Sequence, residues 1–426
     1  MTKKSPLFII GTLFFVFGFV TWLNSVLIPF LKIACELNNF QSYFVTFAFY
    51  IAYFVLAIPS AGILEKIGYR RGMSVGLWIM AMGALVFVPA AMSRNFALFL
   101  VGLFLLGAGL ALLQTASNPY AAIIGPMESA ARRIGIMGVC NKIAGVIAPF
   151  FLSSLVLKDT DAIKESLLFY ESSGILDGKE LLLNDLARKC MLPYLCIAFC
   201  LFLLSVWIRK SSLPEISTSS LPSASIPPTK EKFSLKKYPQ LIGGIVAIFF
   251  YVGAEVISID TLINYAQSYD IPIQLAKMFP SFSMLALILG YFIGIWGIPK
   301  YFSQRTALMV SAILGVLLSI LVLFFPGKNG LFILIWLGLA NAMIWPSVWG
   351  LAIRDLGSHV SLGSSFLIMA IVGGALLPLL YGLLVDKIGF QYSYAILLPC
   401  YIIIFLYGLN QRRDVIKNEN TKTKAN

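Results

Sequence analysis

Twelve apolar stretches, each long enough to cross a lipid bilayer as a helix, dominate this chain of 426 residues. A membrane-spanning helix needs about 20 predominantly apolar residues, because the hydrocarbon core is about 30 Å thick. Helices satisfy their backbone hydrogen bonds internally, so they are stable where there is no water. The sequence therefore predicts an all-α polytopic membrane protein with twelve transmembrane helices. The predicted spans are residues 7–33, 40–64, 72–92, 96–121, 133–156, 190–208, 239–266, 274–298, 303–325, 329–352, 361–385 and 390–409.

The charged residues are too few for a soluble protein. They make up 12% of the chain, whereas a soluble domain carries roughly 25%, and this difference excludes a soluble enzyme. Lys3 and Lys4 precede the first apolar stretch, and no small-residue cleavage site follows it. We therefore interpret this stretch as a true span and not as a removed signal peptide.

The distribution of basic residues predicts the orientation. An even number of spans puts both termini on one side, and that side holds 21 Lys and Arg residues against ten on the other. Because cytoplasmic segments carry the excess of basic residues, we expect cytoplasmic termini and a place in the plasma membrane of a bacterium, its inner membrane. The net charge of +13 is then an orientation signal, and we expect no nucleic-acid partner.

Two long polar segments divide the chain. Residues 1–208 form a predicted N-terminal half of six helices, which includes an extracytoplasmic loop at 157–189 with amphipathic helical segments. Residues 209–238 are rich in Ser, Pro and Lys, and this composition predicts a cytoplasmic linker. Residues 239–410 form a predicted C-terminal half of six helices, and 411–426 a cytoplasmic tail.

The two predicted halves share residues at a nearly constant offset. Gly145-x-x-x-Pro149 recurs as Gly374-x-x-x-Pro378, and Pro119 matches Pro346. Matches that follow one another in the same order in both halves favour a duplicated unit of six spans. Two parallel repeats around an axis normal to the membrane place a substrate site between them, near the midplane.

Three ionisable residues lie well inside predicted spans: Lys142, Glu255 and Asp260. A charge inside a membrane is expensive, so these residues are candidates for cation coupling. Glu255 is predicted to bind a proton, sodium or substrate hydroxyls, or alternatively to form an ion pair with Lys142 that holds the halves together. Lys142 has the further alternative of reaching the cytoplasmic interface with its long side chain. We expect Asp260 to be hydrated near the outer mouth.

Side-chain amides and tryptophans in the spans are candidates for binding a substrate with several hydroxyl groups, because amides donate and accept hydrogen bonds and an aromatic ring stacks on a sparsely polar face. The alternatives are hydrogen bonding between helices for the amides and plain packing for the tryptophans. The predicted substrate-binding residues are Trp22, Asn24, Ser25, Gln114, Asn118, Asn141, Glu255, Asn341 and Trp345.

The segment GILEKIGYRRG at 62–72 resembles the loop signature of the major facilitator superfamily. The resemblance implies a gating latch at the cytoplasmic mouth, in which the acid and the basic residues pair with a neighbouring helix end in one state and release it in the other. The residues of the latch are Gly62, Glu65, Gly68, Arg70 and Arg71.

Further stretches are similar to the fucose–glucose/galactose–hexose permease family. They are WLNSVLIPF (22–30), LLQTASNPYAAIIGP (112–126), NKIAGVIAP (141–149), YVGAEVISIDTLINY (251–265) and GSSFLIMAIVGGALLP (363–378). The resemblance implies the major facilitator fold and cation-coupled import of glucose- or galactose-type hexoses by alternating access.

The chain departs from the fucose branch at two positions. Where that branch has carboxylates in spans 1 and 4, this chain has Ser25 and Gln114, neither of which carries a proton. The pattern is closer to the glucose/galactose branch, and the co-transported ion is left open between sodium and a proton. The alternatives are a proton-coupled importer of fucose or an amino sugar on the same fold, and a membrane sensor or lipid scramblase.

Motifs for other chemistry do not occur in the sequence. There is no Walker loop, nucleophile elbow or metal-ligand cluster. The six cysteines lack a paired C-x-x-C spacing, and the lone His359 falls in a short loop. We therefore expect a secondary transporter that is not an enzyme and has no metal or cofactor beyond a co-transported ion. Its predicted partners are a small-molecule sugar and the lipid bilayer, and we expect a monomer.

Overall fold

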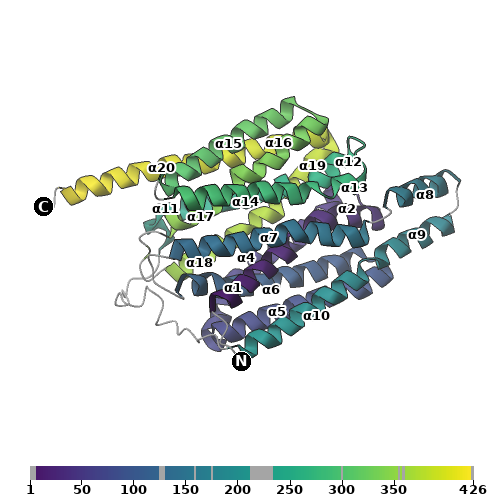
Figure 1. The fold of residues 1–426 in the computed structure, drawn as a ribbon, viewed down its shortest axis with the longest axis horizontal. Helices are drawn as coiled ribbons and strands as arrows, with labels where there is room; N and C mark the ends of the chain where they lie inside the picture. Colours follow the sequence, from purple (N-terminus) through teal and green to yellow (C-terminus); the bar gives the residue numbers. More distant parts are fainter. Residues whose placement is uncertain are drawn as a thin grey trace.

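Long helices running side by side make up the molecule (Figure 1). The computed structural model describes residues 6–123, 130–157, 160–173, 176–211, 234–298, 301–353, 356 and 360–423, and within these ranges the regular elements are helices without a strand. The prediction of an all-α polytopic fold is therefore confirmed.

The helices fall into two groups along the chain. The N-terminal group comprises α1 (Pro6–Trp22), α2 (Asn24–Ala34), α3 (Asn39–Ser42), α4 (Phe44–Ile67), α5 (Tyr69–Ser93), α6 (Phe96–Ile123), α7 (Ala130–Val156), α8 (Thr160–Ser173), α9 (Leu176–Arg188) and α10 (Met191–Lys210). The C-terminal group comprises η4 (Leu235–Lys237), α11 (Pro239–Asp260), α12 (Leu262–Gln267), α13 (Ile273–Ala276), α14 (Phe279–Gly297), α15 (Gln304–Phe324), α16 (Gly327–Asn341), α17 (Ile344–Ala352), α18 (Val360–Met369), η6 (Ala370–Val372), α19 (Gly373–Ser393), η7 (Tyr394–Ile396) and α20 (Leu397–Thr423). Most of the predicted linker, residues 212–233, lies outside the described residues.

The described residues contain eleven helical runs that are long and apolar enough to cross a membrane. The last run, Leu362–Gln411, has 50 residues, which is about 75 Å of helix at 1.5 Å per residue and far exceeds one crossing. Gly389, with φ 80° and ψ 167°, interrupts the helical backbone within this run. We therefore count the run as two crossings, in agreement with the predicted spans 361–385 and 390–409.

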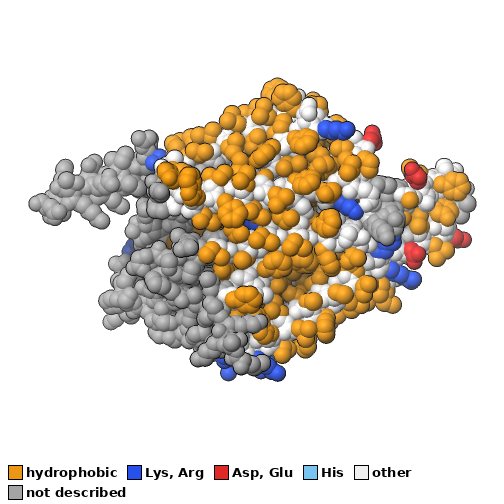
Figure 2. All heavy atoms as spheres, viewed as in Figure 1, with side chains coloured by type: hydrophobic (Ala, Val, Ile, Leu, Met, Phe, Trp, Pro, Cys, Tyr) orange, Lys and Arg blue, Asp and Glu red, His pale blue; other side chains and the backbone are white. Residues whose placement is uncertain are grey.

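The two ends of the bundle differ. α1 begins and α20 ends on the same side, which we call the terminal end, whereas α8 and α9 project at the opposite end, which we call the α8–α9 end (Figure 1). These two helices confirm that the segment 157–189 contains helical structure, and Leu168, Phe169 and Leu181 are exposed on them. Between the two ends, the visible face is covered by hydrophobic side chains (Figure 2), as expected of a surface in contact with lipid.

Several spans are interrupted next to polar residues. Leu23 separates α1 from α2, and the following residue is Asn24. Thr261 separates α11, which ends at Asp260, from α12. A third interruption follows Asn341 at the end of α16. Such breaks free backbone groups and turn side chains away from the regular helical face, and in transporters they accompany binding sites inside the membrane.

The two groups of helices touch along their length, through α7 against α14 and through α4 against α19. Glycines allow this close approach at one point in particular. A Cβ atom on Gly145 would come within 2.7 Å of the Trp22 ring and 2.9 Å of the Met284 sulfur, so a larger residue would push α7 away from its neighbours.

The groups also meet at the α8–α9 end. The Asn39 side-chain amide donates a hydrogen bond of 2.7 Å to Asp386 Oδ1, and the Phe40 backbone N–H donates one of 3.0 Å to Asp386 Oδ2. Beside them, the rings of Tyr43 and Tyr381 pack edge to face at 5.6 Å. The α8–α9 end is therefore closed between the groups.

Candidate functional site

An ion pair between Lys142 and Glu255 crosses the interface between the two groups of helices. Lys142 Nζ on α7 donates to Glu255 Oε1 on α11 at 2.9 Å, and each residue is 7% exposed. The sequence left this pair as one of two interpretations, and the structure confirms that it forms. The alternative in which Lys142 extends to the membrane interface is wrong, because its ammonium group is buried against a carboxylate.

Aromatic side chains surround the pair. The ring of Trp22 lies 4.6 Å from Lys142 Nζ, within the range of a cation–π interaction. Tyr251 and Tyr291 interact electrostatically with Glu255. Sequence reasoning did not single out these two tyrosines, because Tyr is common in apolar spans and gives no local signal of what it faces.

The energetic balance of such a pair is delicate. Removing two charges from water carries a large penalty, which the attraction between them in the interior offsets only with good geometry. Loss of one partner leaves an uncompensated charge and costs about 3–5 kcal/mol. A pair of this kind between two groups of helices is therefore suited to act as a switch, since any ligand or proton that replaces one of its partners changes how the two groups hold together.

Asp260 is not hydrated, which corrects the sequence-based expectation. It is 1% exposed, and neither carboxyl oxygen has a hydrogen-bond partner among the described residues. The reason is tertiary: α2 packs against both helices that flank the break after Asp260, α11 and α12, and Tyr43 and Tyr50 of the N-terminal group interact with the carboxyl. It remains a candidate for cation coupling, but as a buried group.

The predicted polar residues of α2 are buried near this region. Asn24 is 1% exposed, and its amide nitrogen has no hydrogen-bond partner in the described part of the chain. Ser25 instead donates to the backbone carbonyl of Trp22 at 2.9 Å, a local bond within its own span. The amide nitrogen of Asn24 is therefore unengaged in this arrangement, whereas the Ser25 hydroxyl is engaged, and substrate binding by Asn24 stays a prediction.

The amides of α6 and α7 are only partly buried. The Gln114 amide donates to the Tyr53 hydroxyl at 3.1 Å, and the Asn141 amide donates to the Phe14 backbone carbonyl at 3.3 Å. Asn141 directly precedes Lys142, so it lies at the level of the ion pair. The side chain of Asn118 lies outside the described residues.

Asn341 is placed differently from the other amides. It is fully buried, donates to Ser258 Oγ at 3.1 Å and accepts from the Tyr401 hydroxyl at 2.8 Å. This network ties α16 to α11 and α20, which matches the alternative interpretation of hydrogen bonding between helices. Nearby, the rings of Trp345 and Trp349 stack at 5.3 Å, and Trp345 is only partly buried.

The predicted latch is described only in part. Gly68 has φ 80°, a left-handed conformation that glycine adopts without strain, and it forms the tight turn between α4 and α5. Arg70 donates to the backbone carbonyl of Ser211, and Arg71 and Gly62 are exposed. The side chain of Glu65 lies outside the described residues, so the latch pairing stays a prediction.

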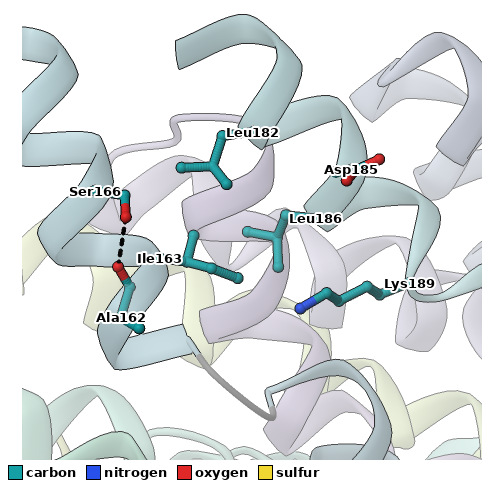
Figure 3. A pocket seen from close by; sticks show the side chains of 7 residues that line it. All are labelled: Ala162, Ile163, Ser166, Leu182, Asp185, Leu186 and Lys189. Atoms are coloured by element: carbon teal, nitrogen blue, oxygen red, sulfur yellow. Dashed lines mark hydrogen bonds between the residues drawn. The ribbon is translucent and has the colours of Figure 1, made fainter. Parts of the chain in front are cut away.

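A separate pocket opens between α8 and α9, with a volume of about 200 Å³ (Figure 3). Ile163, Leu182 and Leu186 point toward one another across it, with Asp185 and Lys189 at its side. The pocket belongs to the α8–α9 end and does not include the ion pair. Its lining is mixed, with Ser166, Asp185 and Lys189 beside four apolar side chains. Among the described residues, His, Cys, Asp and Glu side chains do not gather in groups of three or more that could hold a metal ion.

Comparison with known proteins identifies what the chain is similar to. The family profile described as Major Facilitator Superfamily matches residues 10–371. A "Glucose/galactose transporter" of Brucella abortus biovar 1 (strain 9-941) is 34% identical over 402 residues, covering 93% of this chain and 92% of the relative. An "L-fucose-proton symporter" of Escherichia coli (strain K12) is 30% identical over 409 residues, covering 95% and 92%.

A solved structure has the same architecture. The crystal structure of a major facilitator superfamily transporter, FucP, in the outward conformation superposes with a TM-score of 0.73 at 28% sequence identity. The alignment covers 96% of this chain and 99% of that one. The arrangement of helices is therefore shared over essentially the whole length of both chains.

Proposed function

This chain belongs to the Major Facilitator Superfamily, and from that premise we propose that it imports a neutral monosaccharide together with a proton. The observation that carries the proposal is the buried pair of Lys142 and Glu255, which joins the two groups of helices at 2.9 Å. Two partly buried amides lie on helices of the N-terminal group, Gln114 on α6 and Asn141 on α7 directly before Lys142.

The pair acts as a switch between two arrangements of the molecule. A sugar hydroxyl both donates and accepts hydrogen bonds, so it binds either partner of the pair and weakens the attachment between the groups. Protonation of Glu255 has the same effect, because a neutral carboxyl no longer attracts Lys142 strongly. Linkage then requires that proton and sugar change each other's affinity by the same factor.

The orientation of transport follows from the charge distribution. The terminal end faces the cytoplasm in this proposal, because its segments hold 21 basic residues against ten at the α8–α9 end. The two moving parts are the predicted halves 1–208 and 239–410, joined by the linker 209–238. The protein acts in the plasma membrane of a bacterium, and we propose that it works as a monomer.

The substrate is a hexose, with glucose and galactose as the first candidates. A relative of that name shares 34% of its residues with this chain. The second candidate is fucose, because relatives named L-fucose-proton symporter share 30% and 29%. Those names include a proton, which supports the proton over sodium as the coupled ion.

Uptake by the purified protein in proteoliposomes tests this proposal. Labelled glucose, galactose and fucose are presented in turn, first with an imposed proton gradient and then with an imposed sodium gradient. We expect a proton gradient to drive accumulation of at least one of these sugars, and a protonophore to abolish it. Absence of accumulation under both gradients would overturn symport, and accumulation driven by sodium alone would overturn the choice of proton.

A further inference from the structure

Asp260 occupies a position that the proposed switch does not explain. It is the last residue of α11, 1% exposed, and both carboxyl oxygens lack a hydrogen-bond partner within the described ranges. The next residue, Thr261, donates to the Ile257 carbonyl and shares a hydrogen bond with the Tyr394 hydroxyl. The hydroxyl of Thr261 is therefore hydrogen-bonded, while the carboxyl of the residue before it is not, among the described residues.

Within the described part of the chain, the causes that act on Asp260 include no opposite charge. The charged group that interacts with it is Glu255, a like charge on the same helix. Tyr43 and Tyr50 interact with it from the N-terminal group, and phenols ionise only near pH 10. Tyr291 and Tyr401, on helices that also pack against α11, interact with Glu255 instead. An ionised carboxylate in this place would be buried without a counter-ion of its own among the described residues, because Lys142 is already paired with Glu255.

Unpartnered donors lie around the same break. The amide nitrogens of Asn24 on α2 and of Asn264 on α12 have no hydrogen-bond partner in the described structure, and α2 contacts α12 directly. The side chain of Asn264 lies close to the Tyr43 hydroxyl. This region is thus polar, closed and incompletely hydrogen-bonded, which is typical of a site that changes between two states.

A plug of four tyrosines closes the region at the α8–α9 end. The ring centroids lie 5.6 Å apart for Tyr43 and Tyr381, 5.1 Å for Tyr381 and Tyr394, and 5.4 Å for Tyr265 and Tyr394. Tyr43 belongs to the N-terminal group and the other three to the C-terminal group. Separation of the groups at this end would pull Tyr43 away from Tyr381 and let water reach Asp260.

We propose that Asp260 is the proton-binding group that controls closure of the α8–α9 end, so that the tyrosine plug forms only over a neutral carboxyl. A buried carboxylate without a partner is so unfavourable that the group takes up a proton instead. When the plug is open, water solvates the carboxylate and the group ionises readily. Closure therefore binds one proton, and ionisation favours the open arrangement.

The inference rests on the proposed function only for the direction of transport. With the α8–α9 end outside, Asp260 takes its proton from the outer solution as the sugar is enclosed. Turnover then requires that the proton leaves toward the cytoplasm, and Glu255 is the next carboxyl on α11 in that direction.

Distance measurements without any sugar test the inference separately from transport. Spin labels are placed at Ser93→Cys and Lys328→Cys, exposed positions of the two groups, in the full chain with its six natural cysteines replaced. The protein is held in lipid nanodiscs from about pH 5.5 to about pH 8.5. We expect the ratio of open to closed molecules to rise with pH, by up to about tenfold per pH unit.

Variants identify the responsible group. Asp260→Asn should stay closed and lose the pH dependence, whereas Asp270→Asn, an exposed carboxyl of the same segment, should behave as the unmodified protein. An unchanged pH dependence in Asp260→Asn would overturn the inference.

If this variant does not fold, Asp260→Glu should shift the midpoint of the pH dependence, and an unshifted midpoint would overturn the inference equally. A dependence on sodium, tested against choline, in place of a dependence on pH would overturn the inference, because the site would then bind a metal cation and not a proton. Failure of sugar uptake alone would affect only the proposed function.

Discussion

Two carboxyl groups on α11, five residues apart, differ in nearly every respect that matters for a charge inside a membrane. Glu255 meets Lys142 at 2.9 Å across the interface between the groups. Asp260 meets no hydrogen-bond donor among the described residues, although it is at least as buried. The first is stabilised as a charge, and the second is tolerated only when neutral. The comparison shows that two carboxyls of similar depth differ in their partners, and the partner decides how stable each one is as a charge.

Removal of Lys142 should have the largest effect on stability, because it leaves Glu255 as a buried carboxyl without a partner, as Asp260 already is. We expect Lys142→Met to lower the free energy of unfolding by about 3–5 kcal/mol, the usual cost of leaving one member of a buried pair. The double variant Lys142→Met/Glu255→Met should recover most of this loss, because it leaves no unpaired charge. Unfolding of the four proteins of this double-mutant cycle in detergent provides the measurement. A single variant as stable as the unmodified protein would show that the pair is energetically unimportant.

Replacement of Glu255 by a neutral residue should uncouple sugar uptake from the proton gradient but leave the exchange of sugar across the membrane partly intact. With one coupled proton, a gradient of two pH units concentrates sugar by up to about a hundredfold, since each unit is worth tenfold. Glu255→Gln should reduce this accumulation to the level of equilibration and retain part of the exchange of labelled for unlabelled sugar. Asp270→Asn serves as the matched control. If Glu255→Gln concentrates sugar as well as the unmodified protein, Glu255 has no role in coupling.

The same contrast between engaged and unengaged groups applies to two amides. Asn341 is held by Ser258 and Tyr401, whereas the amide nitrogen of Asn24 has no partner in the described structure. Asn341→Ala should destabilise the protein by about 1–3 kcal/mol, because it strands two buried hydroxyls, and leave the half-saturating sugar concentration unchanged. Asn24→Ala should raise that concentration by about tenfold, equivalent to one hydrogen bond, without loss of stability. If Asn341→Ala instead raised the half-saturating sugar concentration and Asn24→Ala instead lowered stability, Asn341 would be the sugar-binding amide and Asn24 the structural one.

Asp386 provides the smallest expected effect, because it is a carboxylate that is both exposed and hydrogen-bonded. Water stabilises its charge in either arrangement, so loss of its bonds to Asn39 and Phe40 should matter little. We expect Asp386→Ala to change the free energy of unfolding by less than about 1 kcal/mol. A thermal unfolding series beside Asp270→Ala measures the change, and a loss as large as that of Lys142→Met would show that burial is not the deciding variable.

The sequence predicted the residues of the candidate site better than their roles. Lys142, Glu255 and Asp260 are recognisable because charges are rare in apolar spans, and the ion pair was among the interpretations that the sequence offered. The burial of Asp260 was not predictable, because the helices packed around it include segments of the N-terminal group more than 200 positions earlier in the chain. Likewise, nothing local distinguishes Asn341 from Asn24, since the partners of Asn341 are 83 and 60 residues away.

The sequence by itself determined the class of the protein: helices that cross a membrane, their number, and the family. These properties follow from the length of the apolar stretches and from short motifs, both of which are local. Only the tertiary structure decided which carboxyl is paired, which amide is engaged and which end is closed. Those outcomes depend on contacts between distant helices, and inside a membrane a polar group has no water to replace a missing partner.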